Sequence, residues 1–331
     1  MSDYSNFMVV IGASAGGLEA IDAVISGLPR GLPAAIFIVQ HMSPESTGKT
    51  LLARLSRNGA FKSKLAADGD RFEKGQIYIG RPDYHLLVKE DFVLVTKGAR
   101  ENRYRPSIDP LFRSAAVAYG PAVIGIILSG MLDDGTAGLA AIQRCGGITI
   151  VQDPKEADYP DMPQNAFNSI KADYCIPTAK MGVLLEKITS QEPGKNKAIP
   201  KDIETEAMIA ERVLSNVAEV NSLGLQVPYN CPNCGGVLWE MGEKDIRRYR
   251  CHTGHSYTAS ALLTSQSEKI EETLWVSLRM FEERKNLLNG MAHKEGYTKR
   301  KGSYSERAKE TEVHIELIRE MLLAPQISAK K

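Results

Sequence analysis

Continuous apolar runs alternate with helix-type patterns over roughly the first 188 residues of the chain. The runs contain few polar residues, and they cover 9–11, 34–40, 122–128 and 147–152. Strands that are buried on both faces, as in a parallel sheet, have this pattern. The runs therefore predict four buried strands.

The stretches between these runs carry apolar residues at helical spacing. After the first run, Leu18, Ile21, Val24 and Ile25 share one face of a helix. The same spacing predicts helices over 43–58, 107–120 and 135–147. Strands that alternate with helices are typical of an α/β domain, so we predict a doubly wound, mostly parallel sheet.

Residues 75–98 interrupt this alternation. Short strand-like segments lie on both sides of three polar residues, Lys89, Glu90 and Asp91. Two such segments joined by a short polar turn predict an antiparallel pair. We therefore expect a β-hairpin insertion within the α/β domain.

The pattern changes after Glu186. Residues 189–202 are polar and include two prolines, as in a linker, and 203–220 has the periodicity of a short helix. Two amphipathic helices are predicted over 259–291 and 304–323, separated by a basic loop. Their apolar stripes are expected to pack together as a helical hairpin; the stripes are Ile270, Leu274, Leu278, Phe281 and Leu288, and Leu317, Ile318, Met321 and Leu322.

Composition and charge exclude several classes of function. The 331 residues include 41 basic and 40 acidic ones, so a net charge of +1 gives no general attraction to nucleic acid or membranes. No apolar run has the length of a membrane span, and the N-terminus lacks the features of a signal peptide. Five cysteines, three of them close together, argue against a disulfide framework. We predict a cytoplasmic protein with no nucleic-acid partner and no membrane insertion.

Three polar residues, Ser14, His41 and Asp134, follow three of the predicted strands. Because the carboxyl ends of parallel strands meet at one edge of a sheet, we expect these side chains to lie together. They are the groups that nucleophilic acyl transfer requires. Histidine takes the serine proton, aspartate fixes the imidazole tautomer, and amides at a helix N-terminus stabilise the oxyanion.

Each of the three residues also has a simpler interpretation. Ser14, in the glycine-rich turn 12–16, and Asp134 both fit helix caps, and His41 fits a residue at the rim of a sheet. Residues 12–16 match the G-x-S-x-G nucleophile elbow as well. The order serine, histidine, aspartate nevertheless excludes the α/β-hydrolases, in which the acid precedes the histidine.

Five segments, GASAGG, VQHM, RPSIDPLFRSAA, LSGMLDDGTAGL and VQDPKEADYPDMPQNA, resemble the catalytic domain of chemotaxis protein-glutamate methylesterases (CheB type) over about residues 6–188. The resemblance implies that Ser14 is the nucleophile, His41 the general base and Asp134 the orienting acid, with Asp133 as a neighbour. It also implies that methyl esters are removed from methylated glutamates on the cytoplasmic helices of a chemoreceptor-like protein. Many members of the family also deamidate glutamines, and none uses a cofactor in catalysis.

The sequence departs from the family pattern in two ways. Ala15 stands where some members have threonine, which removes a hydroxyl near the expected oxyanion. The chain also begins directly at the catalytic domain, so we expect no receiver domain and no control by phosphorylation in cis. Met131 matches a position near the active site of the family.

Cys231, Cys234, Cys251 and His255 form a second group of reactive side chains. Three thiolates and one imidazole complete the closed, tetrahedral site that is typical of structural zinc. His252 is a rival fourth ligand, but the gap between Cys251 and His255 lets both of those side chains point inward. We predict a zinc ribbon with one structural Zn²⁺, in which 237–241 and 247–251 pair as strands. We expect it to be remote from the catalytic edge and unnecessary for its chemistry.

We therefore predict four parts: a methylesterase catalytic domain (1–188), a linker and short helix (189–222), a zinc ribbon (223–258), and a helical hairpin with a tail (259–331). The leading function is a serine hydrolase that acts on glutamate methyl esters. The alternative is a receptor-associated scaffolding protein, which keeps the esterase fold and binds a partner through its ribbon and helical tail. The basic stretch 97–107 is either a surface for an acidic receptor or a solvated loop.

Overall fold

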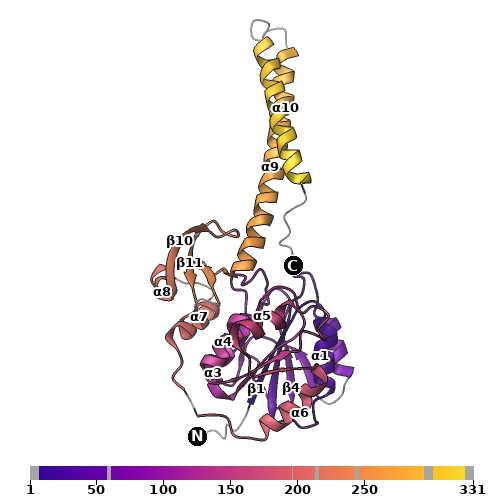
Figure 1. Ribbon diagram of the computed structural model, residues 1–331, viewed down its shortest axis with the longest axis vertical. Helices are drawn as coiled ribbons and strands as arrows, with labels where there is room; N and C mark the ends of the chain where they lie inside the picture. Colours follow the sequence, from indigo (N-terminus) through magenta and orange to yellow (C-terminus); the bar gives the residue numbers. More distant parts are fainter. Residues whose placement is uncertain are drawn as a thin grey trace. The chain divides into compact units, whose positions relative to one another are not determined.

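The computed structural model describes residues 7–57, 61–195, 197–212, 216–242, 246–293 and 301–324. The chain divides into two compact units, Met1–Leu262 and Leu263–Lys331. The first unit contains a seven-stranded sheet with its helices and a smaller four-stranded sheet (Figure 1). The second unit is helical.

All strands of the larger sheet are parallel. They lie in the order β3-β4-β2-β1-β7-β8-β9, which places β1 (Phe7–Ala13) at the centre with every residue buried. The other strands are β2 (Ala34–Gln40), β3 (Lys62–Leu65), β4 (Gln76–Ile79), β7 (Val123–Ile127), β8 (Ile148–Gln152) and β9 (Tyr174–Ile176). The predicted doubly wound α/β fold is confirmed.

Helices cover both faces of this sheet (Figure 1). Val9 and Ile11 of β1 pack with α1 (Gly17–Ser26), α2 (Lys49–Arg57) and α6 (Thr178–Thr189). Met8 and Val10 pack on the other side with α3 (Ile108–Tyr119), α4 (Thr136–Arg144) and α5 (Asp161–Ile170). Successive side chains of a strand point to opposite faces, so β1 contributes to two cores and has to be apolar throughout.

Only part of the predicted insertion is a hairpin. β5 (His85–Val88) and β6 (Val93–Thr96) pair antiparallel and are joined across the predicted turn. Residues 76–79, in contrast, form β4 of the parallel sheet, where their apolar side chains are buried beside β2. The helix predicted over 43–58 begins only at Lys49, because Gly48 has a left-handed φ of +68°.

The stretch predicted as one short helix forms two. α7 (Lys201–Arg212) buries Ile203 and Ile209, and α8 (Val217–Leu223) begins with a capping box between Asn216 and Glu219. The side chain of Asn216 accepts a hydrogen bond from the Glu219 amide, which has no partner within the first turn of the helix. This cap makes Asn216 the start of a separate helix. The short 3-10 turn Gly120–Ala122 and the strands β3 and β9 were also not predicted.

The smaller sheet, here called the ribbon, lies in the segment for which a zinc ribbon is predicted. It consists of β10 (Gly224–Asn230), β11 (Val237–Met241), β12 (Arg248–Cys251) and β13 (Ser256–Thr258), all antiparallel. The predicted pairing of β11 with β12 is confirmed. The prediction that the ribbon is remote from the catalytic edge is wrong, because Ser256 of β13 pairs with Glu101 of the larger domain.

The two long helices are α9 (Ala259–His293) and α10 (Lys301–Leu323). Within the second unit they form the predicted hairpin, in which Arg319 donates to Glu282 at 2.9 Å. The predicted stripes are only partly buried, since Ile270, Leu317 and Met321 are 62%, 51% and 64% exposed. Of the predicted stripes, Leu288 belongs to the buried cluster of this hairpin, together with three residues outside the stripes: Ala292, Tyr304 and Ala308.

Most of the predicted basic loop, 294–300, and the end of the tail, 325–331, lie outside the described residues. Within the described part of the chain, no helix combines the length and the apolar character that crossing a membrane requires.

Candidate functional site

Ser14 lies where β1 ends and the chain turns into α1. The turn depends on Gly16, whose φ is +67° and whose missing side chain makes room for its neighbours. A Cβ atom on Gly16 would lie 2.7 Å from Ser129 Oγ. Gly130 is equally constrained, because a Cβ atom there would lie 2.8 Å from the Cβ of Ser14. The glycines of this region therefore let three loops converge on the serine.

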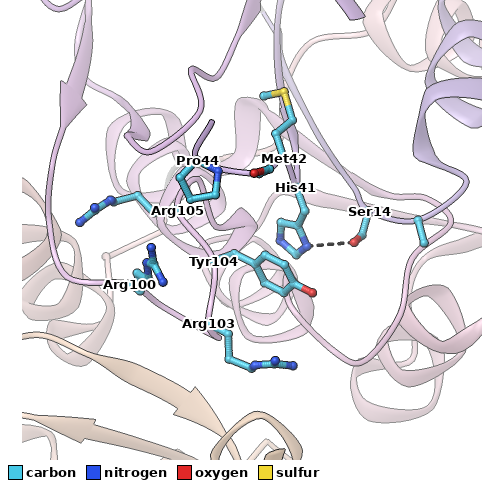
Figure 2. A pocket seen from close by; sticks show the side chains of 10 residues that line it. Ser14, His41, Met42, Pro44, Arg100, Arg103, Tyr104 and Arg105 are labelled. Atoms are coloured by element: carbon cyan, nitrogen blue, oxygen red, sulfur yellow. Dashed lines mark hydrogen bonds between the residues drawn. The ribbon is translucent and has the colours of Figure 1, made fainter. Parts of the chain in front are cut away.

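The three predicted catalytic side chains lie together at the carboxyl ends of β1, β2 and β7. Ser14 Oγ lies 3.0 Å from His41 Nδ1 (Figure 2). On the other side of the ring, His41 Nε2 lies 2.7 Å from Asp134 Oδ2. An ionised carboxylate only accepts hydrogen bonds, so Nε2 carries the proton of the neutral ring. Nδ1 is then the acceptor that faces the serine hydroxyl.

Asp134 is buried and surrounded by donors. Besides His41, it accepts hydrogen bonds from Asn102 Nδ2 at 2.7 Å, from Ile108 N at 2.8 Å and from Ser107 Oγ at 2.9 Å. Burial by itself would raise the pKa of Asp134, but the hydrogen bond and the charge of His41, together with the other donors, hold it below its usual value. Asp134 is therefore ionised and fixed in orientation.

Sequence reasoning missed three residues of this site. Tyr104 stacks on the His41 ring with centroids 3.6 Å apart and an interplanar angle of 11°. Asn102 and Ser107 hold the carboxylate of Asp134. All three belong to or border the basic stretch 97–107, where Glu101 and Asn102 are only 2% and 3% exposed. The interpretation of this stretch as a solvated loop is therefore wrong.

Asp133 takes no part in the hydrogen bonds to His41. Its two carboxylate oxygens accept from the hydroxyls of Thr258 and Ser260, each at 2.7 Å. Burial raises the pKa of Asp133, although these two donors act in the opposite direction. Met131 is 50% exposed and is not among the residues that line the pocket described next.

A pocket of about 390 Å³ opens over the serine and the histidine. Its wall is formed by residues from three loops: Ser14, Ala15, His41, Met42, Ser43, Pro44, Arg100, Arg103, Tyr104 and Arg105 (Figure 2). The pocket has the size of a small-molecule or side-chain site. It is also strongly basic, because three arginines contribute to one wall.

Comparison with known proteins identifies the family of the α/β domain. A family model described as CheB methylesterase matches residues 9–185, which is just over half of the 331 residues. The chain belongs to the CheB methylesterase family. The match includes Ser14, His41 and Asp134 and ends before the ribbon.

Several relatives carry the name protein-glutamate methylesterase/protein-glutamine glutaminase 2, and two of them are described here. The one from Methanosarcina mazei is 38% identical over 189 residues, which are 55% of this chain and 51% of the relative. The one from Xanthomonas campestris pv. campestris is 40% identical over 188 residues, 56% of this chain and 52% of the relative. The chain thus spans about half the length of these relatives.

One solved structure is matched over nearly its whole length, unlike the two relatives above. The crystal structure of the Thermotoga maritima CheB methylesterase catalytic domain shares 34% identity with this chain, with a TM-score of 0.53. The match covers 55% of this chain and 98% of that structure. The shared part is therefore the catalytic domain.

The structure also brings together the four predicted metal ligands. The donor atoms of Cys231, Cys234, Cys251 and His255 all lie within 4.8 Å of one another, and His252 does not belong to this cluster. The sulfur atoms of Cys234 and Cys251 are 3.7 Å apart. Two sulfurs on a tetrahedral zinc ion, each bound at 2.3 Å, would be about 3.8 Å apart.

Two tight turns shape this cluster. In the first, the amide of Gly235 donates to the Cys231 carbonyl at 2.8 Å, and in the second the amide of Gly254 donates to the Cys251 carbonyl at 3.0 Å. Both glycines have positive φ values, +74° and +103°. The donor set of three thiolates and one imidazole fits zinc, because it is soft and leaves no coordination position free.

Proposed function

We propose that this protein is a serine esterase that removes methyl esters from methylated glutamates of a chemoreceptor-like protein. The observation that carries the proposal is the position of His41, which lies between the Ser14 hydroxyl and the buried Asp134 carboxylate. This arrangement alone would serve any acyl transfer. The names of the relatives supply the substrate class.

In the proposed reaction, Ser14 Oγ attacks the ester carbonyl while its proton passes to Nδ1 of His41. The tetrahedral intermediate collapses when His41 returns this proton to the methoxy oxygen, so that methanol leaves an acyl-enzyme on Ser14. A water molecule then loses a proton to His41 and attacks the acyl carbon. When this second tetrahedral intermediate collapses, His41 returns the proton to Ser14 Oγ, which frees glutamate and the serine. Asp134 stays ionised and stabilises the imidazolium.

The N-terminus of α1 is suited to stabilise the oxyanion. The Ser14 amide donates to the Ser129 carbonyl at 2.9 Å, so the amides of Ala15 and Gly16 are the candidate oxyanion donors. Ser14 precedes α1 by three residues, so the positive end of the helix dipole is also close to the attacked carbonyl. Glutamine would react by the same steps, with ammonia in place of methanol. Proton donation by His41 is then even more important, because an amide nitrogen leaves poorly without a proton.

We further propose that Cys231, Cys234, Cys251 and His255 bind one structural zinc ion. The support is the distance between the donor atoms and the closed ligand set. The metal would supply no step of the reaction. It would hold β12 and β13 of the ribbon, whose small core requires such a cross-link.

The test is methanol release from a methylated receptor. Ser14→Ala should abolish the release, because it removes the nucleophile. Ser43→Ala is the matched control, since Ser43 also lines the pocket but lies outside the triad, and it should stay within about threefold of wild type. Equal rates for Ser14→Ala and wild type would exclude Ser14 as the nucleophile. The scaffolding alternative, by comparison, has no observation in its favour.

A further inference from the structure

Residues 100–105, here called the bridging segment, lie between the ribbon and the catalytic triad. Arg100, Arg103, Tyr104 and Arg105 line the pocket. Glu101 and Asn102 point the other way and are buried. The bridging segment therefore contacts the substrate pocket on one side and the interior on the other.

The ribbon binds the bridging segment through its backbone. The amide of Asn102 donates to the Ser256 carbonyl at 2.8 Å, and the amide of Ser256 donates to the Arg100 carbonyl at 3.3 Å. Ser256 belongs to β13, so the bridging segment continues the small sheet as a short parallel bridge. Asn102 and Arg103 have φ values of +50° and +77°. Such left-handed conformations are unfavourable for residues other than glycine, so the contact with β13 helps to maintain them.

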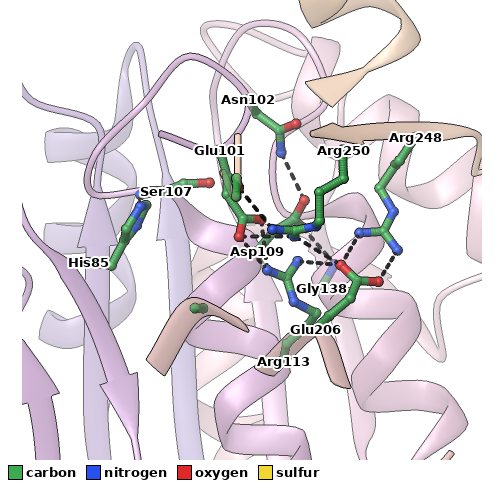
Figure 3. Close-up of polar contacts among 12 residues, drawn as sticks. His85, Glu101, Asn102, Ser107, Asp109, Arg113, Gly138, Glu206, Arg248 and Arg250 are labelled. Atoms are coloured by element: carbon green, nitrogen blue, oxygen red, sulfur yellow. Dashed lines mark hydrogen bonds and ion pairs between the residues drawn. The ribbon is translucent and has the colours of Figure 1, made fainter. Parts of the chain in front are cut away.

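Buried ion pairs strengthen this contact (Figure 3). Glu101 of the bridging segment pairs with Arg113 of α3 at 2.7 Å and with Arg250 of β12 at 3.0 Å. Glu206 of α7 pairs with Arg250 at 3.1 Å and with Arg248 of β12 at 2.6 Å. Without the ribbon, Glu206 would lose Arg248 and Arg250, and Glu101 would lose Arg250 and keep only Arg113. Removing the partner of a buried charge is unfavourable.

The side chain of Asn102 connects the ribbon to the triad. Its Oδ1 accepts from the Thr258 amide at 3.0 Å, and its Nδ2 donates to Asp134 at 2.7 Å and to Asp109 at 2.8 Å. A backbone amide can only donate, so Thr258 selects the orientation in which the amide oxygen of Asn102 faces β13. That orientation directs the Nδ2 donors at the carboxyl groups of Asp134 and Asp109. The opposite orientation would place an oxygen against Asp134 and Asp109.

The metal cluster lies next to these contacts in the chain. Cys251 ends β12, and His255 directly precedes β13. The amide of Cys251 donates to the His255 carbonyl at 3.0 Å, so the two ligands close the turn that leads into β13. A small domain of this kind folds only when its metal is bound. Loss of the metal would therefore release Ser256 and Thr258.

We propose that the ribbon is a positioning module for the catalytic acid: with metal bound, β13 fixes Asn102, and Asn102 orients Asp134 toward His41. Asn102 is thus a positioning residue, and metal occupancy of the Cys/His cluster sets the rate at which Ser14 reacts. This inference rests on the proposed function only in so far as Ser14 is a reactive nucleophile. It does not depend on the identity of the ester.

The test uses the full chain and two probes that need no receptor: labelling of Ser14 by a fluorophosphonate, and hydrolysis of p-nitrophenyl acetate. Asn102→Ala should lower kcat by about 10- to 100-fold, as expected when a catalytic group is misplaced, with KM nearly unchanged. Asn102→Asp has the same shape and keeps the acceptor for Thr258, but it replaces the Nδ2 donor by an oxygen. It should be at least as slow as Asn102→Ala. Wild-type kcat in Asn102→Asp would show that only shape matters and would overturn the inference.

The second arm changes the metal. Zinc-loaded protein is compared with protein stripped by a chelator and with Cys234→Ser, whose side chain is exposed and contributes little to packing. Both should label Ser14 at least tenfold more slowly, and added zinc should restore the rate of the stripped protein only. Cys175→Ser, outside the cluster, is the control and should label at the wild-type rate.

The outcomes separate the two proposals. Equal labelling with and without zinc would overturn the role of the ribbon and leave the esterase intact. Absence of any Ser14 labelling in zinc-loaded wild type would overturn both. Zinc-dependent labelling without methanol release from a methylated receptor would support the positioning role and contradict only the proposed substrate.

Discussion

Ser14, His41 and Asp134 follow strands whose positions the main core determines. β1 is buried at every residue and lies between β2 and β7, so the three strand ends are fixed by packing. The ribbon has a much smaller core, formed by Cys231, Leu238, Tyr249, Cys251, Tyr257, Ala261 and Leu262. Ion pairs and a few backbone contacts join it to the larger domain, and in our proposal a bound metal ion holds its turns.

We infer from this difference that a catalytic site on a large core can depend on a module with a small core. Packing fixes where the triad residues lie, but it leaves the orientation of the Asp134 carboxylate to hydrogen-bond donors. Asn102, one of these donors, is held by the ribbon. We expected the ribbon to lie far from the catalytic edge. The hydrogen bonds of Asn102 to Thr258 and to Asp134 instead join the two.

The largest expected effect concerns the catalytic edge itself. Asp134→Asn should lower kcat by about 10⁴-fold, because the amide stabilises the histidine tautomer with its proton toward Ser14. Steady-state hydrolysis of p-nitrophenyl acetate measures this loss. Asp133→Asn is the matched control. The Asp133 carboxylate accepts from the hydroxyls of Thr258 and Ser260 and not from His41, so this substitution should lower kcat by less than about tenfold. Similar losses in the two variants would contradict the assignment of Asp134.

The next largest effect concerns the ion pairs that join the ribbon to the larger domain. Glu206→Gln removes a negative charge that faces three buried arginines, Arg113, Arg248 and Arg250. Breaking a buried ion pair typically lowers the free energy of unfolding by about 3–5 kcal/mol, and we expect a decrease of this size. Urea denaturation measures the change. Glu204→Gln, at an exposed position of the same helix, should change it by less than about 0.5 kcal/mol. Equal stability of the two variants would show that the ion pairs do not hold the ribbon in place.

The same contrast explains which features the sequence could predict. Strands of the core follow from apolar runs, and Ser14, His41 and Asp134 follow from their positions at strand ends. Cys231, Cys234, Cys251 and His255 follow from spacing. All of these features can be predicted from short stretches of sequence. In the structure, the three residues at the strand ends lie together, and so do the four residues of the Cys/His cluster.

Asn102 and Tyr104 could not be found in this way. They lie in a stretch that is polar and basic, yet Glu101 is buried because Arg250 pairs with it from 149 positions further along the chain. No local sequence pattern predicts a contact over such a separation. The polar composition of 189–202 likewise suggested a separating linker, although Asp202 at the start of α7 is paired with Arg144 at 2.6 Å.

The smallest expected effect is a dependence of stability on pH that arises beside the triad. Asp109 is buried, and burial together with the charge of Asp134 raises its pKa to about 7. Between about pH 4 and pH 7 the folded protein therefore keeps a proton on Asp109 that the unfolded chain releases. The stability that this proton contributes is fully present below pH 4 and is lost as the pH rises through 7.

One proton limits the slope of this contribution to about 1.4 kcal/mol per pH unit. Asp109→Asn removes the titrating group, so its free energy of unfolding, relative to wild type, should improve steadily from pH 4 to pH 7 and then level off. The variant also loses an acceptor for Asn102 or Gly138, which shifts its stability at every pH but leaves this trend unchanged. Urea titrations at several pH values measure the difference. A difference that stays constant across this range would show that Asp109 is ionised in the folded protein, and that the donors from Asn102 and Gly138 outweigh its burial.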